Sequence, residues 1–159
     1  MHDLLPLAAQ VGARLKARGE TIAIAESSSG GLLSASLLAV PGASAYFVAG
    51  AVVYTARARS RLMDLHREDV AGMRSASEPY ALLLARTAAQ RFGTTWGLSE
   101  TGAAGPTGNP YGDSAGHSCI ALAGPSERAL ALETGESDRV SNMRAFAAAA
   151  LRLIAAALD

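Results

Sequence analysis

A short cluster of serine and glycine residues follows an apolar run and offers the first candidate for chemistry. Serine hydroxyls can act as nucleophiles or hydrogen-bond donors, and glycine lets a ligand approach the backbone closely. Where such a turn leads from a strand into a helix, unpaired N–H groups at the helix start can hold a phosphate or a developing oxyanion. The site residues predicted on this turn are Ser27, Ser28, Ser29, Gly30 and Gly31.

A second candidate is the glycine-rich segment 101–109, which follows another apolar run. Ligands of open α/β sheets bind outside the carboxyl ends of the strands, so we expect both loops at the same sheet edge. Two such loops could close around one nucleotide, and a long irregular loop in a compact domain is often functional. The binding residues predicted on this segment are Thr101, Gly102, Ala104, Gly105 and Pro106.

Each of these features also has a purely structural interpretation. Ser28 and Ser29 could simply cap a helix, the glycines could simply form a tight turn, and the second loop could be an ordinary connection. Tyr54, followed by the arginine-rich segment 57–61, is typical of an aromatic strand end beside a solvated basic face. The histidines, Trp96 and the single cysteine show no spacing that indicates chemistry. The residues alone therefore predict no more than a phosphate or oxyanion site.

Apolar periodicity and turn residues predict strands and helices that alternate along the chain. Strands are expected over residues 21–25, 47–55, 95–99, 118–123 and 129–133. Helices are expected from Leu4 to the glycine at 19 and over residues 32–40, 56–65, 77–92 and 138–158, with a loop over residues 100–116. This order predicts an α/β domain over residues 1–159, in which helices cover both faces of one mixed sheet of about five strands.

Composition narrows the partners and the location. Fourteen basic and fourteen acidic residues balance, which removes the electrostatic argument for nucleic acid as a partner. One cysteine and three scattered histidines cannot supply a tetrahedral zinc set, so we expect no metal and no cofactor. The start of the sequence lacks the pattern of a secretory signal, which predicts a cytoplasmic protein. The apolar segment 145–158 is shorter than the roughly 18 residues that span a membrane and predicts a core helix.

Several motifs in the same order resemble one known family. Residues 25–31, AESSSGG, are similar to the AES-C/S-T/S-GG signature of the CinA C-terminal domain family. Tyr54 and the residues after it occupy the place of the family's TYSNxxK segment, and residues 77–79 match its SEP motif. Residues 101–106 match T-G-I/A-A-G-P, and Arg139 falls where the last helix of the family carries an arginine. The resemblance covers nearly the whole chain.

The resemblance implies a three-layer α/β/α domain with a mixed, mostly parallel sheet. It also implies an enzyme that hydrolyses the carboxamide of nicotinamide mononucleotide to nicotinate mononucleotide and ammonia, without a metal. By resemblance, Ser27 is the nucleophile. The tyrosine and lysine of the family segment would activate this serine and manage protons, because a neutral lysine can act as a base.

One catalytic position departs from the family pattern. Arg59 stands where the lysine is expected, five residues after Tyr54. A guanidinium group stays protonated and cannot readily take a proton from a serine, although it can bind phosphate or stabilise negative charge. The departure weakens the prediction of an amidase with Ser27, Tyr54 and Arg59 as its catalytic residues.

A second departure lies in residues 109–117, NPYGDSAGH, which replace the K-P-V-G-T-V of the family. The ligand pocket is therefore expected to differ. The chain also lacks the larger domain that precedes this one in full-length CinA proteins, so it resembles a stand-alone member of the family.

The sequence leaves three hypotheses. The first is a metal-independent amidohydrolase that acts on a pyridine mononucleotide, with the oxyanion held by N–H groups of the serine turn and Tyr54 relaying the proton. The second, motivated by Arg59, is a catalytically inactive module that binds a nucleotide or has a regulatory role. The third is an amidohydrolase with a changed substrate. We also expect a homo-oligomer, because the composition is rich in apolar residues and low in charge.

Overall fold

The computed structural model describes all residues 1–159 and contains one five-stranded sheet, five α-helices and a 3₁₀ turn. The strands are β1 (Ile22–Glu26), β2 (Phe47–Val52), β3 (Trp96–Ala103), β4 (His117–Ala123) and β5 (Arg128–Glu133). The helices are α1 (Leu5–Arg18), α2 (Leu32–Leu38), α3 (Ala56–Met63), α4 (Glu78–Phe92) and α5 (Arg139–Ala157), with the 3₁₀ turn η1 at Ala43–Ala45.

The sheet has the strand order β2-β1-β3-β4-β5 and is mixed, as the sequence predicts. Strand β1 pairs in parallel with β2 and β3, whereas β4 pairs antiparallel with both β3 and β5. Four strands therefore run in one direction and only β4 runs against them. The carboxyl ends of β1, β2 and β3 meet at one edge, where ligands of α/β sheets bind.

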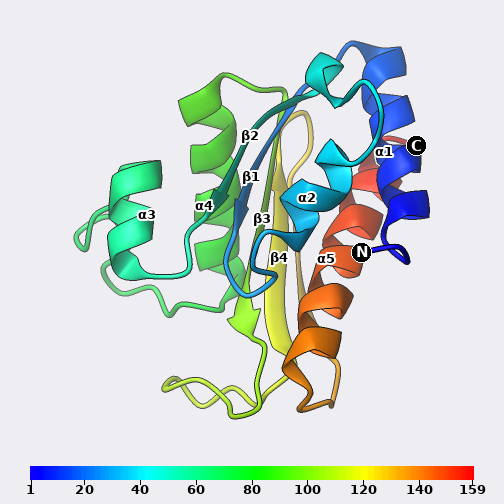
Figure 1. Ribbon diagram of the computed structural model, residues 1–159. Coiled ribbons are helices and arrows are strands. Elements are labelled where there is room, and N and C mark those ends of the chain that lie inside the picture. The colour runs from blue at the N-terminus through cyan, green and yellow to red at the C-terminus, as the bar shows by residue number, and fades with distance from the viewer.

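Helices cover both faces of the sheet, which makes three layers (Figure 1). Helices α1, α2 and α5 pack on one face against large apolar side chains such as Ile22, Ile24 and Leu98. Helix α4 packs on the other face against small side chains such as Ala23 and Ala121, with α3 beside it. The alternation of large and small residues along the strands therefore assigns each face to a different set of helices.

Helix ends follow the predicted capping residues. Gly19 and Gly93 end α1 and α4 in the left-handed conformation, with φ of 64° and 62°. At the start of α4, the Ser77 hydroxyl accepts a hydrogen bond from the N–H of Tyr80 at 3.4 Å. These local signals predicted the boundaries well because each depends on neighbouring residues only.

The predicted loop over residues 100–116 is wrong in its first part. Strand β3 continues to Ala103, where Glu100 to Ala103 pair with residues 117–120 of β4. Polar residues and glycine there suggested a loop. Pairing with β4 instead provides hydrogen-bond partners for the backbone N–H and C=O groups and keeps the segment extended. The loop that remains covers residues 104–116.

The last helix, α5, agrees with the helix predicted over residues 138–158. Helix α5 has 19 residues and is, by length and composition alone, apolar enough to cross a membrane. Several of its buried residues, among them Ala150, Leu151 and Ile154, lie in the largest apolar cluster with residues of α1 and the sheet. This packing is that of the core helix that the sequence predicts.

Candidate active site

The serine turn lies between β1 and α2, in the strand-turn-helix arrangement that the sequence predicts. Gly30 and Gly31 adopt φ of 66° and 97°, a conformation that residues with a side chain rarely adopt. The two glycines thereby turn the chain from the end of β1 into the start of α2. The turn lies at the edge where the parallel strands end.

Glu26, the last residue of β1, occupies the N-terminus of α2. Its side chain is fully buried. One carboxylate oxygen accepts from the Ser29 hydroxyl at 2.7 Å and from the N–H groups of Gly31 and Leu33 at 3.0 and 3.1 Å. The other accepts from the N–H and hydroxyl of Ser34 at 2.9 and 2.5 Å. The N-terminus of α2, where an anionic ligand could bind, is therefore already occupied by the side chain of Glu26.

A second buried carboxyl group, that of Glu100 on β3, accepts hydrogen bonds from the same turn. It accepts hydrogen bonds from the N–H groups of Ser27 and Ser29 at 3.2 and 2.7 Å and from the Ser118 hydroxyl at 3.0 Å. Burial raises the pKa of Glu100, and these hydrogen bonds only partly oppose the shift.

The expectation that the N–H groups of this turn are free is therefore wrong for most of them. Glu26 and Glu100 take those of Ser27, Ser29 and Gly31, and the N–H of Gly30 donates to the carbonyl of Ser27. Within the turn, only the N–H of Ser28 donates to no group of the chain. Glu100 is more than 70 residues away from the turn in sequence, and local sequence patterns do not reveal such a partner.

The three predicted catalytic residues come together around one cavity of about 390 Å³. Ser27 contributes from the turn after β1, Tyr54 from the segment after β2, and Arg59 from α3. Thr101 and Gly102, at the end of β3, complete the same wall. The lining contains no histidine, lysine or carboxylate, so no conventional base for a serine lies in this main cavity.

A second cavity of about 250 Å³ adjoins the main cavity. Ser28, Ala104, Gly105 and Arg139 line it, and the two cavities share Tyr54, Gly102, Asn109 and Pro110. Four other predicted binding residues line neither cavity: Ser29, Gly30, Gly31 and Pro106.

The Ser27 hydroxyl makes no hydrogen bond within the chain, whereas its neighbours are engaged in the structure of the turn. The Ser28 hydroxyl donates to the carbonyl of Gly102 at 2.6 Å, which joins the turn to β3. Ser27 is thus the serine of the cluster whose hydroxyl is left available to a ligand in the main cavity.

Arg59 is buried, with 8% of its surface exposed, and no carboxylate lies within 4.0 Å of it. Its Nε donates to the carbonyl of Leu65 at 3.0 Å and its Nη1 to the hydroxyl of Tyr80 at 3.4 Å, while Nη2 has no partner in the chain. A buried charge without a counter-ion is costly, so the guanidinium favours an anion in the main cavity.

Tyr54 has Arg139, and not Arg59, as its hydrogen-bond partner. The Nη2 of Arg139 donates to the Tyr54 hydroxyl at 3.1 Å, and its Nη1 donates to the carbonyl of Gly105 at 2.7 Å. The guanidinium carbon of Arg139 also lies 6.0 Å from the centre of the Tyr54 ring. Sequence reasoning matched Arg139 to a family position but did not predict this role.

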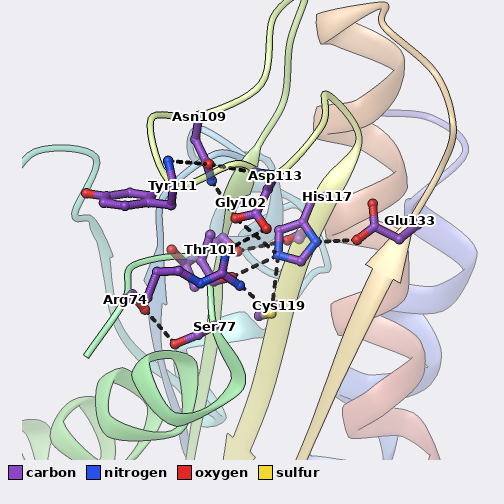
Figure 2. Close-up of polar contacts among 12 residues, drawn as sticks. Arg74, Ser77, Thr101, Gly102, Asn109, Tyr111, Asp113, His117, Cys119 and Glu133 are labelled. Carbon is purple, nitrogen blue, oxygen red and sulfur yellow. Dashed lines mark hydrogen bonds and ion pairs between the residues drawn. The ribbon is translucent and has the colours of Figure 1, made fainter. Parts of the chain in front are cut away.

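A turn over residues 109–113 forms the outer side of the main cavity through Asn109, Pro110 and Tyr111. Sequence reasoning gave none of these residues a role. The available signal was the departure of this segment from the family pattern. His117, to which the sequence gave no chemistry, lies behind the turn with its side chain bonded to Glu133 and to the carbonyl of Ala76 (Figure 2).

Comparison with solved structures identifies the fold. A competence-damaged protein (CinA) superfamily protein from Klebsiella pneumoniae superimposes with a TM-score of 0.90 at 23% identity, covering 98% of this chain and 97% of that one. A competence/damage inducible protein from Agrobacterium tumefaciens gives a TM-score of 0.89 at 26% identity, covering 98% and 95%. The three-layer α/β/α arrangement is shared with both.

Sequence relatives give the family. A CinA-like protein from Anaeromyxobacter sp. (strain K) is 41% identical over 140 residues, which are 87% of this chain and 34% of that protein. A CinA-like protein from Chlorobium limicola is 38% identical over 147 residues, 89% of this chain and again 34% of the relative. The chain thus spans about a third of the length of these curated relatives. Because the family model described as the CinA C-terminal domain matches residues 4–158, the chain belongs to the CinA C-terminal domain family.

Proposed function

We propose that this chain hydrolyses the carboxamide of nicotinamide mononucleotide to give nicotinate mononucleotide and ammonia. The observation that carries the proposal is that Ser27, Tyr54 and Arg59 line one cavity. An unengaged serine hydroxyl that shares a cavity with a buried, unpaired guanidinium suits attack on a carbonyl group whose oxygen becomes negatively charged. Membership of the CinA C-terminal domain family supports hydrolase chemistry.

The two adjoining cavities suit the two ends of a mononucleotide. The main cavity would take the pyridine ring and its carboxamide. The second cavity would take the ribose phosphate, because Arg139 and the glycine-rich backbone of residues 102–108 line it. Guanidinium groups and close backbone approach are common features of phosphate sites.

The proposed reaction passes through an acyl-serine. The Ser27 Oγ attacks the carboxamide carbon, a C–O bond forms, and the carbonyl oxygen becomes an oxyanion. The serine proton passes through the Tyr54 hydroxyl to the amide nitrogen, the C–N bond breaks, and ammonia leaves. Water then attacks the acyl-serine, which releases the carboxylic acid and returns a proton to Ser27.

Charge stabilisation would replace a strong base in this site. The free N–H of Ser28 and the guanidinium of Arg59 are the donors suited to the oxyanion, and one well-placed donor contributes about 3 kcal/mol to catalysis. Arg59 cannot take the serine proton, because it remains charged. The proposal therefore assigns Arg59 to electrostatics and Tyr54 to proton transfer.

A second candidate function is nucleotide binding without turnover. The observation that favours it is the structural engagement of Arg59 with Leu65 and Tyr80 in a cavity that lacks lysine, histidine and carboxylate. Such a module would keep the anion-binding pocket and lack a group to activate Ser27. It would be stabilised by ligand, by about 2.7 kcal/mol at 100 times the dissociation constant, without releasing ammonia.

A third candidate is an amidohydrolase for a different nucleotide amide. The turn over residues 109–113 that lines the main cavity favours it, since these residues differ from the family pattern. A small panel of nucleotide amides tests this candidate. A cytoplasmic location and a homo-oligomeric state belong to the proposal as further expectations, and light scattering measures the second.

The deciding experiment is ammonia release from nicotinamide mononucleotide, without added metal, by the parent, Ser27→Ala and Arg59→Lys proteins. Turnover by the parent that is lost in Ser27→Ala supports the amidohydrolase. A folded parent that binds the nucleotide without turnover, and gains activity with Arg59→Lys, supports the inactive module. Turnover that survives in Ser27→Ala excludes the serine mechanism.

A further inference from the structure

We infer, on the basis of the function proposed above, that Tyr111 is a specificity-determining residue whose ring stacks on the aromatic ring of the substrate. We infer further that the ion pair of Arg74 with Asp113 positions it. Tyr111 and Asp113 lie in segment 109–117, which differs from the family pattern. The cavity that Tyr111 lines is the one that holds Ser27 and Arg59.

Aromatic residues are concentrated at this cavity. The chain has four tyrosines, and three of them, Tyr54, Tyr80 and Tyr111, line it. The hydroxyl of Tyr54 is held by Arg139, and Tyr80 is buried with its hydroxyl bonded to Arg59. Tyr111 is 52% exposed and its hydroxyl makes no hydrogen bond in the chain, so its ring is the one left free for a ligand.

The backbone of Tyr111 is held in a closed turn. The side-chain oxygen of Asn109 accepts from the N–H groups of Tyr111 and Asp113 at 3.0 and 3.1 Å, and the Asn109 N–H donates to the carbonyl of Asp113 at 3.1 Å. Gly112 has a φ of 97°, and a Cβ at Gly108 would collide with the backbone of Asp113. Both glycines are therefore needed for this turn to close.

Asp113 anchors the turn to the rest of the fold. Its carboxylate accepts from Arg74 Nη1 at 2.6 Å and from Asn109 Nδ2 at 2.8 Å, and the Nε2 of His117 on β4 lies 3.8 Å away. Burial alone would raise the pKa of Asp113, but these groups outweigh it and lower the pKa. Figure 2 shows the carboxylate between the side chains of Arg74 and His117, with the Tyr111 ring directed away from them.

Arg74 is itself tied to the start of α4. Its backbone carbonyl accepts from the hydroxyl of Ser77, the N-cap of α4, at 2.5 Å. The turn is thus bound to β4 through His117 and to α4 through Arg74. An aromatic side chain on such a restrained turn loses little freedom when a ligand binds, which favours recognition of a planar ring.

The test compares a ligand with the aromatic ring and one without it. Binding of nicotinamide mononucleotide and of ribose 5-phosphate is measured by calorimetry for the parent, Tyr111→Ala and Tyr111→Phe. We expect Tyr111→Ala to weaken nicotinamide mononucleotide binding at least tenfold, about 1.4 kcal/mol, and ribose 5-phosphate less than twofold. Tyr111→Phe should bind both like the parent. Equal losses for both ligands, or no loss, would overturn the inference.

Asp113→Asn tests the positioning role. This variant should weaken the binding of nicotinamide mononucleotide but not that of ribose 5-phosphate. The double variant with Tyr111→Ala should lose no more affinity than Tyr111→Ala alone. A general structural defect would weaken the binding of both ligands and lower the melting temperature. That result would overturn the positioning role of Asp113.

Ammonia release separates this inference from the proposed function. A parent without turnover whose binding still depends on Tyr111 overturns the amidohydrolase and leaves the stacking intact. A parent with turnover whose KM is unchanged in Tyr111→Ala overturns the stacking and leaves the amidohydrolase intact. A parent that binds neither ligand overturns both.

Discussion

Arg139 donates a hydrogen bond from Nη2 to the Tyr54 hydroxyl at 3.1 Å and so joins the start of α5 to the segment after β2. Its second hydrogen bond, to the Gly105 carbonyl, adds the loop after β3. One guanidinium thereby connects three segments that are far apart in sequence. Tyr54 lies between the two cavities and belongs to both, so Arg139 maintains the division of the site.

The first prediction concerns Arg139. Arg139→Gln should weaken nicotinamide mononucleotide binding about tenfold, because it removes both the charge in the second cavity and the support of Tyr54. The free energy of unfolding should fall by only about 2 kcal/mol, because two hydrogen bonds with a net value of about 1 kcal/mol each are lost. Calorimetry and urea unfolding measure the two effects.

Arg144→Gln is the matched control, since Arg144 lies on the same helix and pairs with Asp3 at the surface, away from both cavities. Its binding should equal that of the parent. Equal loss of binding in the two variants would show that α5 as a whole, and not the Arg139 contacts, maintains the site.

The second prediction concerns the unpaired charge of Arg59. Arg59→Met should change the free energy of unfolding by about 1 kcal/mol or less without ligand, because removing an unpaired buried charge offsets the loss of its hydrogen bonds. The stabilisation by nicotinamide mononucleotide, about 2.7 kcal/mol for the parent at 100 times its dissociation constant, should fall by at least half. Urea unfolding with and without ligand measures both values.

Arg61→Met, on the exposed side of the same helix, controls for the loss of an arginine from α3. It should leave the ligand response unchanged. A full ligand response in Arg59→Met would mean that the anion binds elsewhere in the molecule.

The third prediction concerns Glu100. Glu100→Ala should lower the free energy of unfolding by about 3 kcal/mol. The substitution leaves the N–H groups of Ser27 and Ser29 and the hydroxyl of Ser118 without a hydrogen-bond acceptor. Glu100→Gln keeps an acceptor oxygen and should cost less. Glu127→Ala, which removes an exposed carboxylate paired with Arg86, should change the free energy of unfolding little, because solvent screens an exposed ion pair. Similar losses in the Glu100→Ala and Glu127→Ala variants would contradict the role assigned to Glu100.

The fourth prediction is a pH dependence of stability at His117. Burial would lower the pKa of His117, but hydrogen bonds to Glu133 and the Ala76 carbonyl, with the charge of Asp113, outweigh it and raise the pKa. Cys119, 3.7 Å from Nε2, stays a neutral thiol because burial raises its pKa to about 11. A raised folded pKa stabilises the protein below the unfolded value of about 6.5, and this stability is lost as the pH rises through the folded value.

Urea unfolding of the parent and His117→Gln between pH 5 and pH 9 measures this effect. The difference in unfolding free energy between the two proteins should be largest at the acid end and shrink as the pH rises. His2→Gln, near the N-terminus, serves as the control and should follow the parent. If the difference in unfolding free energy between the parent and His117→Gln grew with pH, the pKa of His117 would be lowered, and not raised, in the folded protein.

Local features of the fold could be predicted from the sequence because they depend on neighbouring residues. The turn of Ser27 to Gly31, the Ser77 cap and the glycines that end α1 and α4 all have local signals. The end of β3 could not be predicted in this way. Its residues Glu100 to Ala103 are polar or small and become a strand only because β4 lies beside them.

The sequence predicted some of the residues that line the two cavities but not the contacts between them. Family motifs brought Ser27, Tyr54 and Arg59 to attention, and the fold places them around one cavity. The hydrogen bonds from the turn's N–H groups to Glu100, and the hydrogen bond between Arg139 and Tyr54, involve pairs separated by many residues. Spacing along the chain carries no signal for such contacts.

Gly97, near the start of β3, has no side chain to keep α4 away, and a Cβ there would collide with the carbonyl of Ala85. Ala85 follows Leu84, which forms part of the wall of the main cavity. Any larger residue at position 97 would push this helix outward and enlarge the space in front of Ser27. The size of the molecule that the main cavity can admit is therefore limited in part by the lack of a side chain at position 97, which is not itself part of the cavity wall.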